Sequence, residues 1–233
     1  MRKALVLSSG GVDSTTCISI AIRDVGVQNV TTVSVFYGQK HSKELECAEK
    51  IANFFGVSHR VIDLSNTHIM DDSNCPLLSK STEEVPELSY AEQIAKNGEG
   101  MVTTYVPFRN GLMLSAVAAL AMSLYPDDYV DIYLGAHADD AAGEAYADCS
   151  EEFTSAMDSA ISIGTYNKVH LVAPLVRLNK AGVVSLGLSL NTPYHLTWSC
   201  YKGGDKPCGK CGTCIDRAKA FEENGIKDPA IGD

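Results

Sequence analysis

The stretch from Ser9 to Ser14, which reads SGGVDS, combines residue types that bind phosphate. Gly10 and Gly11 have no side chains, so an oxyanion can approach their backbone N–H groups. Ser9 and Ser14 add hydroxyl donors, and Asp13 offers a carboxylate of the kind that holds Mg²⁺ against phosphates. The alternative for the loop is a structural glycine turn, and the alternative for Asp13 is a helix N-cap. The pattern favours a nucleotide-phosphate site.

A second group of residues has the spacing of a metal site. Four cysteines fall close together near the C-terminus and read C-x7-C-G-x-C-G-x-C: Cys200, Cys208, Cys211 and Cys214. Four thiolates form a closed tetrahedral zinc site that leaves no open position, so we expect a structural Zn²⁺. An iron–sulfur cluster is the alternative.

The elements that position the glycine stretch can be predicted from hydropathy. Residues 4–7 are an apolar run typical of a buried strand, and a helical pattern follows from residue 15 to 24. A helix that begins at the turn presents unpaired N–H groups and the positive end of its dipole to a phosphate. The stretch has neither the G-K-[ST] ending of a Walker A loop nor a G-x-G-x-x-G fingerprint.

The spelling S-G-G-x-D-S resembles the loop of the PP-loop ATP pyrophosphatases. That resemblance implies an enzyme that cleaves ATP between its α and β phosphates and transfers AMP to a substrate oxygen. We expect ATP to bind along this loop and the first turn of the helix, at Leu7, Ser8, Ser9, Gly10, Gly11, Val12, Asp13, Ser14, Thr15, Thr16 and Cys17.

Composition limits the possible partners. The net charge of −10 argues against broad binding to nucleic acid, which depends on Lys and Arg. No apolar run approaches the length of a membrane helix, and the N-terminus leads straight into a strand without the apolar region of a signal peptide. We therefore expect a cytoplasmic protein with small-molecule substrates, no stable nucleic-acid partner and no membrane contact.

Alternating strands and helices predict a parallel α/β sheet. Further strands are expected at 30–37, 59–64, 129–134 and 169–173, and helices at 42–55, 110–124, 151–163, 179–188 and 215–224. The pattern breaks at 65–101, where only 90–96 favours a helix, so this segment is predicted to be an insertion or lid. We expect an α/β nucleotide-binding domain over 1–195 and a cysteine-rich segment with a terminal helix over 196–233.

Further motifs follow the loop in order along nearly the whole chain. They are YGQKH at 37–41 with Glu44, YVPFRN at 105–110, GAH at 135–137 with Asp139 and Asp140, YADC at 146–149, and TWSC at 197–200. Together with the cysteine cluster they resemble the 7-cyano-7-deazaguanine synthases. This implies an adenine nucleotide alpha hydrolase-like, Rossmann-type fold and a homodimer. It also implies an ATP-dependent ligase that converts 7-carboxy-7-deazaguanine and ammonia into the nitrile preQ0 for queuosine biosynthesis, through an adenylated acid and an amide.

Candidate site residues follow from residue type and from this resemblance. For catalysis we expect Ser9, Asp13, Ser14, Lys40, His41 and Arg109, and for substrate binding Tyr37, Gln39, Arg109, Asn110, Asp139 and Asp148. Arg109 offers a donor fork for a carboxylate or phosphate at a predicted helix start. Glu44 either orients His41 or belongs to a first helical turn, and Cys149 is predicted to be a buried structural thiol.

Three alternatives stay open at this stage. One is a PP-loop enzyme that thiolates tRNA, and another is a relative that transfers a deazapurine to a different acceptor, as in a defence or phage DNA pathway. The third is a nucleotide sensor without catalysis, against which the intact loop argues. Phe108 stands where the resemblance leads us to expect glycine, which either narrows the pocket or marks a subfamily.

Overall fold

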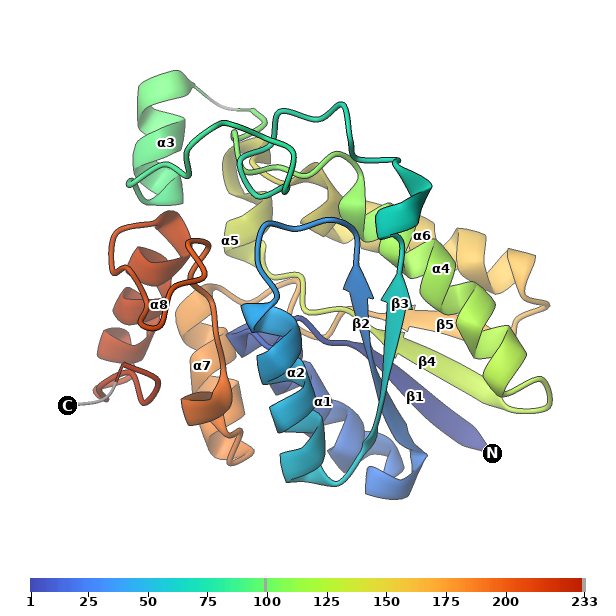
Figure 1. The fold of residues 1–233 in the computed structure, drawn as a ribbon. Coiled ribbons are helices and arrows are strands. Elements are labelled where there is room, and N and C mark those ends of the chain that lie inside the picture. Colours follow the sequence, from blue (N-terminus) through green and yellow to red (C-terminus); the bar gives the residue numbers. More distant parts are fainter. Residues whose placement is uncertain (99, 232–233) are drawn as a thin grey trace.

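A five-stranded parallel sheet forms the centre of the protein (Figure 1). The computed structural model describes residues 1–98 and 100–231. The strands are β1 (Arg2–Leu7), β2 (Val30–Phe36), β3 (Ser58–Asp63), β4 (Tyr129–Tyr133) and β5 (Val169–Val172), in the order β3-β2-β1-β4-β5. The predicted parallel α/β sheet is thus confirmed, with each strand in its expected place.

Helices cover both faces of the sheet, and β1 shows why. Ala4 and Val6 point to a core shared with α1 (Val12–Val25), α2 (Lys43–Phe55), α7 (Lys180–Ser189) and α8 (Gly212–Glu223). Leu5 and Leu7 point to the opposite core, shared with α4 (Arg109–Leu124) and α6 (Glu151–Gly164). Alternate side chains of a strand face opposite sides, so a central strand with apolar residues at every position is buried on both.

The segment between β3 and α4 contains a single α-helix among its described residues, α3 (Tyr90–Asn97), as predicted. Ser89 and Glu92 form a reciprocal capping box at its start. In Figure 1 the segment passes over the carboxyl ends of the strands, and α3 lies beside the cysteine-rich segment that leads into α8. Parallel sheets bind ligands at this edge, so the insertion is placed to cover a site.

Two local features differ from the prediction. Helix α1 begins at Val12 rather than near residue 15, with Gly11 as its N-cap, so Asp13 lies inside the first turn and is not the cap. After β4 the chain forms the short helix α5 (Ala138–Ala141) and two 3₁₀ turns (Ala142–Glu144 and Ala147–Cys149). These pieces are too short to produce a readable hydrophobic period.

The C-terminal helix shares the core of the sheet domain. Phe221 of α8 is fully buried in the same cluster as Ile18 of α1 and Val183 of α7. The boundary predicted at 195 remains a prediction about folding units. Within the described residues no helix is long and apolar enough to cross a membrane.

Candidate active site and metal centre

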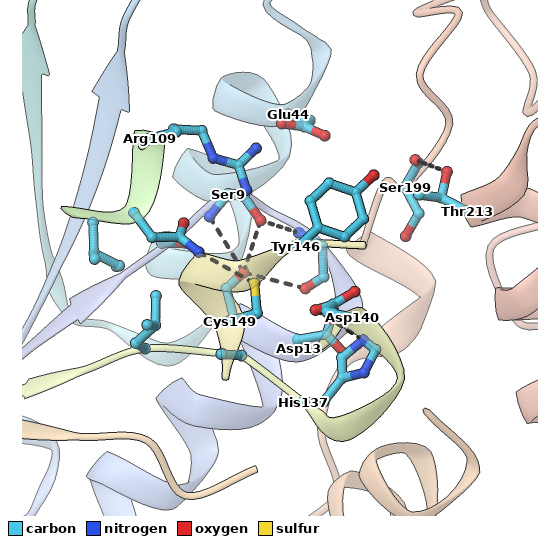
Figure 2. A pocket seen from close by; sticks show the side chains of 18 of the residues that line it. Ser9, Asp13, Glu44, Arg109, His137, Asp140, Tyr146, Cys149, Ser199 and Thr213 are labelled. Carbon is cyan, nitrogen blue, oxygen red and sulfur yellow. Dashed lines mark hydrogen bonds and ion pairs between the residues drawn. The ribbon is translucent and has the colours of Figure 1, made fainter. Parts of the chain in front are cut away.

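A cavity of about 230 Å³ lies at the carboxyl ends of β1, β2 and β4. Its wall is formed by the glycine loop, the start of α2, the start of α4, the segment after β4 and the chain on either side of Cys200. Residues 190 positions apart in the sequence, Ser9 and Ser199, therefore face the same space (Figure 2). The topology brings most of the predicted motifs together here.

The glycine loop presents backbone and hydroxyl donors to this cavity. Ser9 and Ser14 line the wall, with their hydroxyl oxygens 3.3 Å apart. Gly11 is the N-cap of α1 and has no side chain with which to cap the helix, so the first N–H groups of the helix are open towards the cavity. An uncapped helix N-terminus beside two serines suits an anion such as a phosphate.

Gly10 is required where it stands, because the loop passes close to α2. Its φ of +78° is in the left-handed region, and a Cβ there would lie 2.8 Å from the backbone nitrogen of Ala48 and overlap the carbonyl oxygen of Glu44. The glycine loop and the start of α2 are thus in direct backbone contact.

Asp13 is held by a lysine that the sequence did not single out. The Lys180 ammonium donates to both carboxylate oxygens of Asp13, at 2.7 and 2.6 Å. Burial by itself would raise the pKa of Asp13, but Lys180 and His137 outweigh it and lower the pKa. His137 Nε2 lies 3.3 Å from Asp140, so these four residues form one charged cluster on the cavity wall. Figure 2 shows Asp13, His137 and Asp140 side by side.

Arg109 lies on the wall as predicted, and it is only loosely held. Its guanidinium stacks on the Tyr37 ring at 6.0 Å and donates to the Tyr37 hydroxyl at 3.5 Å. Glu44 also lines the cavity, and no hydrogen bond or ion pair to its carboxylate is found among the described residues. Burial raises the pKa of Glu44 to about 7, although Arg109 opposes this.

Several buried polar atoms on the wall have no partner within the described protein. They are the Ser8 hydroxyl, Nε of Arg109 and Nδ1 of His137. Buried polar groups in native proteins are nearly always hydrogen-bonded. Three of the five such atoms among the described residues lie on this wall, which favours a site completed by a polar ligand.

The start of α4 is fixed by its own hydrogen bonds. Asp148 is buried, accepts the Asn110 backbone N–H at 2.9 Å and does not line the cavity. The Asn110 side chain donates to Cys149 Sγ at 3.2 Å. Burial raises the pKa of this thiol well above its ordinary value, as expected for a structural thiol, although Cys149 lies on the cavity wall.

Phe108 does not narrow the cavity. Its φ is +50°, which explains why glycine suits this position, and its exposed ring packs over Gly111 and edge-on to Phe153. It is absent from the cavity lining among the described residues.

Other predicted residues have their polar groups already engaged. Asp139 and Gln39 line the cavity. Asp139 accepts the backbone N–H of Lys180. The Gln39 side-chain amide accepts the backbone N–H of Tyr37 and donates to the carbonyl of Val35. Lys40 is exposed and donates to the carbonyl of Glu83, outside the cavity.

Several other predicted residues do not line the cavity: His41, Val12, Thr15, Thr16 and Cys17. The ring Nε2 of His41 is hydrogen-bonded to the carbonyl oxygen of Tyr201 at 3.1 Å, and His41 is not bonded to Glu44. The hydroxyls of Thr15 and Thr16 donate to backbone carbonyls of their own helix. Val12 and Cys17 belong to the hydrophobic core beneath the loop.

The cysteine cluster is arranged for a metal. The four Sγ atoms of Cys200, Cys208, Cys211 and Cys214 lie within 4.8 Å of one another. Backbone N–H groups of Lys202 and Cys208 point at Cys200 Sγ, at 3.4 and 3.3 Å. Such donors stabilise thiolate charge, so the residues fit a bound cation.

Trp198 connects the metal centre with the glycine loop. Its backbone N–H donates to the carbonyl of Gly10 at 2.8 Å, and its indole N–H donates to the carbonyl of Cys200 at 2.8 Å. Tyr201 follows the first cysteine and bonds Tyr90 of α3 through their hydroxyls at 2.7 Å. The cysteine-rich segment therefore supports both the glycine loop and the insertion.

Sequence reasoning missed Lys180 and did not assign His137 or Asp140 a role. One signal was available for Lys180, since a cation at the first position of a helix opposes the helix dipole and needs an anionic partner. His137 and Asp140 lie in the turns after β4, where no periodic pattern marked them.

Two curated relatives match nearly the whole chain. The 7-cyano-7-deazaguanine synthase of Archaeoglobus fulgidus is 40% identical over 232 residues, covering 99% of this chain and 90% of the relative. The enzyme of the same name from Caldicellulosiruptor saccharolyticus is 42% identical over 227 residues, covering 97% and 94%. Among solved structures, the NH3-dependent NAD synthetase of Campylobacter jejuni is a distant likeness, with a TM-score of 0.45 and 15% identity over 96% of this chain and 75% of that one.

A family model described as "Queuosine biosynthesis protein QueC" matches residues 3–225. The match includes the glycine loop, all five strands apart from Arg2 at the start of β1, and all four clustered cysteines. The chain therefore belongs to the QueC family of queuosine biosynthesis proteins.

Proposed function

We propose that this protein is an ATP-dependent ligase that converts 7-carboxy-7-deazaguanine and ammonia into 7-cyano-7-deazaguanine in queuosine biosynthesis. The observation that carries the proposal is the family membership, with relatives of that enzyme name at about 40% identity along nearly the whole chain. The cavity beside an open helix start supports it, because the reaction begins with ATP.

The chemistry requires activation of a carboxylate, which is a poor electrophile. In this proposal the glycine loop holds the ATP phosphates, and Lys180 stabilises the charge that develops when pyrophosphate leaves. Asp13 and Asp140, on either side of His137, are the carboxylates that we assign to hold Mg²⁺. Arg109 faces the cavity with an unpartnered Nε and is assigned to the substrate carboxylate.

The sequence predicts substrate-binding roles for Tyr37, Asn110 and Asp139, and the proposal assigns them positioning roles at that site. Tyr37 supports Arg109, Asn110 fixes the helix start from which Arg109 projects, and Asp139 orients the start of α7 beside Lys180. The cysteine cluster is assigned a structural Zn²⁺, because four thiolates fill the coordination sphere. A homodimer, a cytoplasmic location and the lack of a stable nucleic-acid partner remain predictions.

One sample tests both parts of the proposal. The purified protein is incubated with ATP, Mg²⁺, ammonium and 7-carboxy-7-deazaguanine, and the products are identified by mass, while the metal content is measured. We expect AMP, pyrophosphate, the nitrile and one zinc per chain. The absence of nitrile and of ATP turnover would refute the enzymatic proposal. Iron and sulfide in the metal analysis would show an iron–sulfur cluster in place of the proposed zinc.

A further inference from the structure

Glu44 is a cavity carboxylate that the described protein leaves without a hydrogen bond or ion pair. Asp13 is paired with Lys180, Asp140 lies against His137, and Asp139 accepts a backbone N–H. Asp216 also lines the wall, but it belongs to α8 and lies near Lys180 and Asp139. The Glu44 carboxylate has no hydrogen bond and no ion pair in the part of the chain that the structure describes.

The position of Glu44 ties it to the site of adenylation. It lies in the first turn of α2, and the carbonyl of Glu44 is in contact with the backbone of Gly10 in the phosphate loop. Figure 2 shows the Glu44 carboxylate on the same side of the cavity as Ser9 and Arg109. A proton acceptor held beside the phosphate loop can reach a nucleophile that attacks a carboxylate activated there.

The proposed reaction needs such an acceptor. Ammonium, like the ammonium of a lysine, keeps its proton at neutral pH and has no electron pair for attack. We propose that Glu44 is the catalytic base that takes this proton, an inference that rests on the proposed ligase function.

The step balances as follows. One N–H proton of ammonium passes to the Glu44 carboxylate, and the freed electron pair forms the C–N bond to the adenylated carboxyl carbon. The C–O bond to AMP breaks and AMP leaves with its electron pair. The second excess proton on nitrogen passes to water, which leaves the amide, AMP and protonated Glu44.

The surroundings of Glu44 suit a base that works near neutral pH. The groups that face it are Arg109 from α4, Tyr37 from the end of β2 and Cys47 from its own helix. Burial raises the pKa of Glu44 to about 7, and Arg109 counteracts this. The carboxylate form accepts protons, so base-assisted amide formation should increase up to about pH 7 and level off above it, whereas attack by free ammonia keeps rising as ammonium deprotonates.

A change of nucleophile separates this role from a role in binding. Hydroxylamine is largely unprotonated at neutral pH and attacks the same adenylate to give a hydroxamic acid without a base. Glu44→Gln is compared with the wild type and with Glu46→Gln, an exposed position on the same helix. We expect Glu44→Gln to lose about 100-fold or more in turnover with ammonium. With hydroxylamine and in ATP–pyrophosphate exchange it should stay within about 5-fold of the wild type. Its ammonium rate should follow the free-ammonia fraction and keep rising above about pH 7, without the levelling off of the wild type.

Two results would overturn the inference. If Glu44→Gln loses turnover equally with both nucleophiles, the residue binds substrate or supports the fold instead. If it keeps the wild-type rate and pH profile with ammonium, it is no base. A wild-type protein that neither exchanges pyrophosphate nor forms hydroxamate would refute the proposed ligase, and with it the substrate for which this step is written.

Discussion

Lys180 and Asp13 form the closest charged contact of the cavity, and both are partly enclosed, with side chains 17% and 23% exposed. The ammonium is thereby held beside the open start of α1, where a phosphate would find two sources of positive potential. An anion at the helix start would share the lysine with Asp13.

Replacing Lys180 by methionine should remove adenylation. We expect Lys180→Met to lower ATP–pyrophosphate exchange about 100-fold or more, because a charge that stabilises the departing phosphates is lost. Lys219→Met is the control, since Lys219 is exposed on α8 and pairs with Glu223. Equal exchange by both variants would exclude Lys180 from the phosphate site.

Gly10 should tolerate no side chain. In Gly10→Ala the left-handed φ costs about 1–2 kcal/mol, and the new Cβ must push α2 away from the loop. We expect lower stability in denaturant unfolding together with loss of turnover, because the loop and Glu44 move apart. The control Gly56→Ala also has a positive φ but meets open space, so it should cost stability of about 1 kcal/mol and no activity.

The predicted site residues that line the cavity belong to contiguous motifs. Ser9, Asp13 and Arg109 stand beside glycine or at a helix start, and the structure places all three on the cavity wall. Lys180 reaches the cavity from a helix that starts 167 residues after Asp13, so no local pattern connects them. Lys40 looked equally suitable in its motif, yet its side chain turns to the Glu83 carbonyl on the surface.

At the scale of elements, the sequence located the strands and long helices because their apolar runs end in glycine or polar turns. It could not show that the insertion and the metal segment meet. That contact depends on Tyr90, Tyr201 and the ion pair of Lys202 with Glu87, which join residues more than 100 positions apart. Such pairings follow from the three-dimensional path of the chain alone.

Removal of the metal should therefore loosen the insertion as well as the cysteine segment. We expect a chelator-treated protein to have a lower Tm and to be cut by protease within residues 65–101, because Tyr201 loses its fixed position next to Cys200. Rebinding of zinc should restore both properties. Unchanged cleavage of the insertion after metal loss would contradict this coupling.

A buried ion pair joins the middle of α8 to the chain that follows this helix. Arg217 donates to both carboxylate oxygens of Asp228 at 2.7 and 2.9 Å, with side chains only 6% and 4% exposed. Asp228→Asn should lower the free energy of unfolding by about 3–5 kcal/mol, because it leaves a buried guanidinium charge without its partner. Asp127→Asn, at an exposed position, should change it by less than about 0.5 kcal/mol in the same denaturant titration.

At the scale of the whole molecule, the two predicted parts share one core. Phe221 and Ala220 of α8 are buried among residues of α1 and α7, and Arg217 bonds the carbonyl of Tyr194. We expect calorimetry of the full, metal-loaded chain to show one cooperative transition. Two separate transitions would instead support independent folding of 1–195 and 196–233.

The chain has a single tryptophan, Trp198, and its position makes it a natural optical reporter. The indole is 7% exposed, donates to the carbonyl of Cys200 and lies beneath the Lys43 ammonium at 5.4 Å, while its backbone is bonded to Gly10. Its emission should therefore be blue-shifted in the resting protein and should respond both to nucleotide entering the loop and to release of the metal. One intrinsic fluorophore can thus follow two binding events without any label.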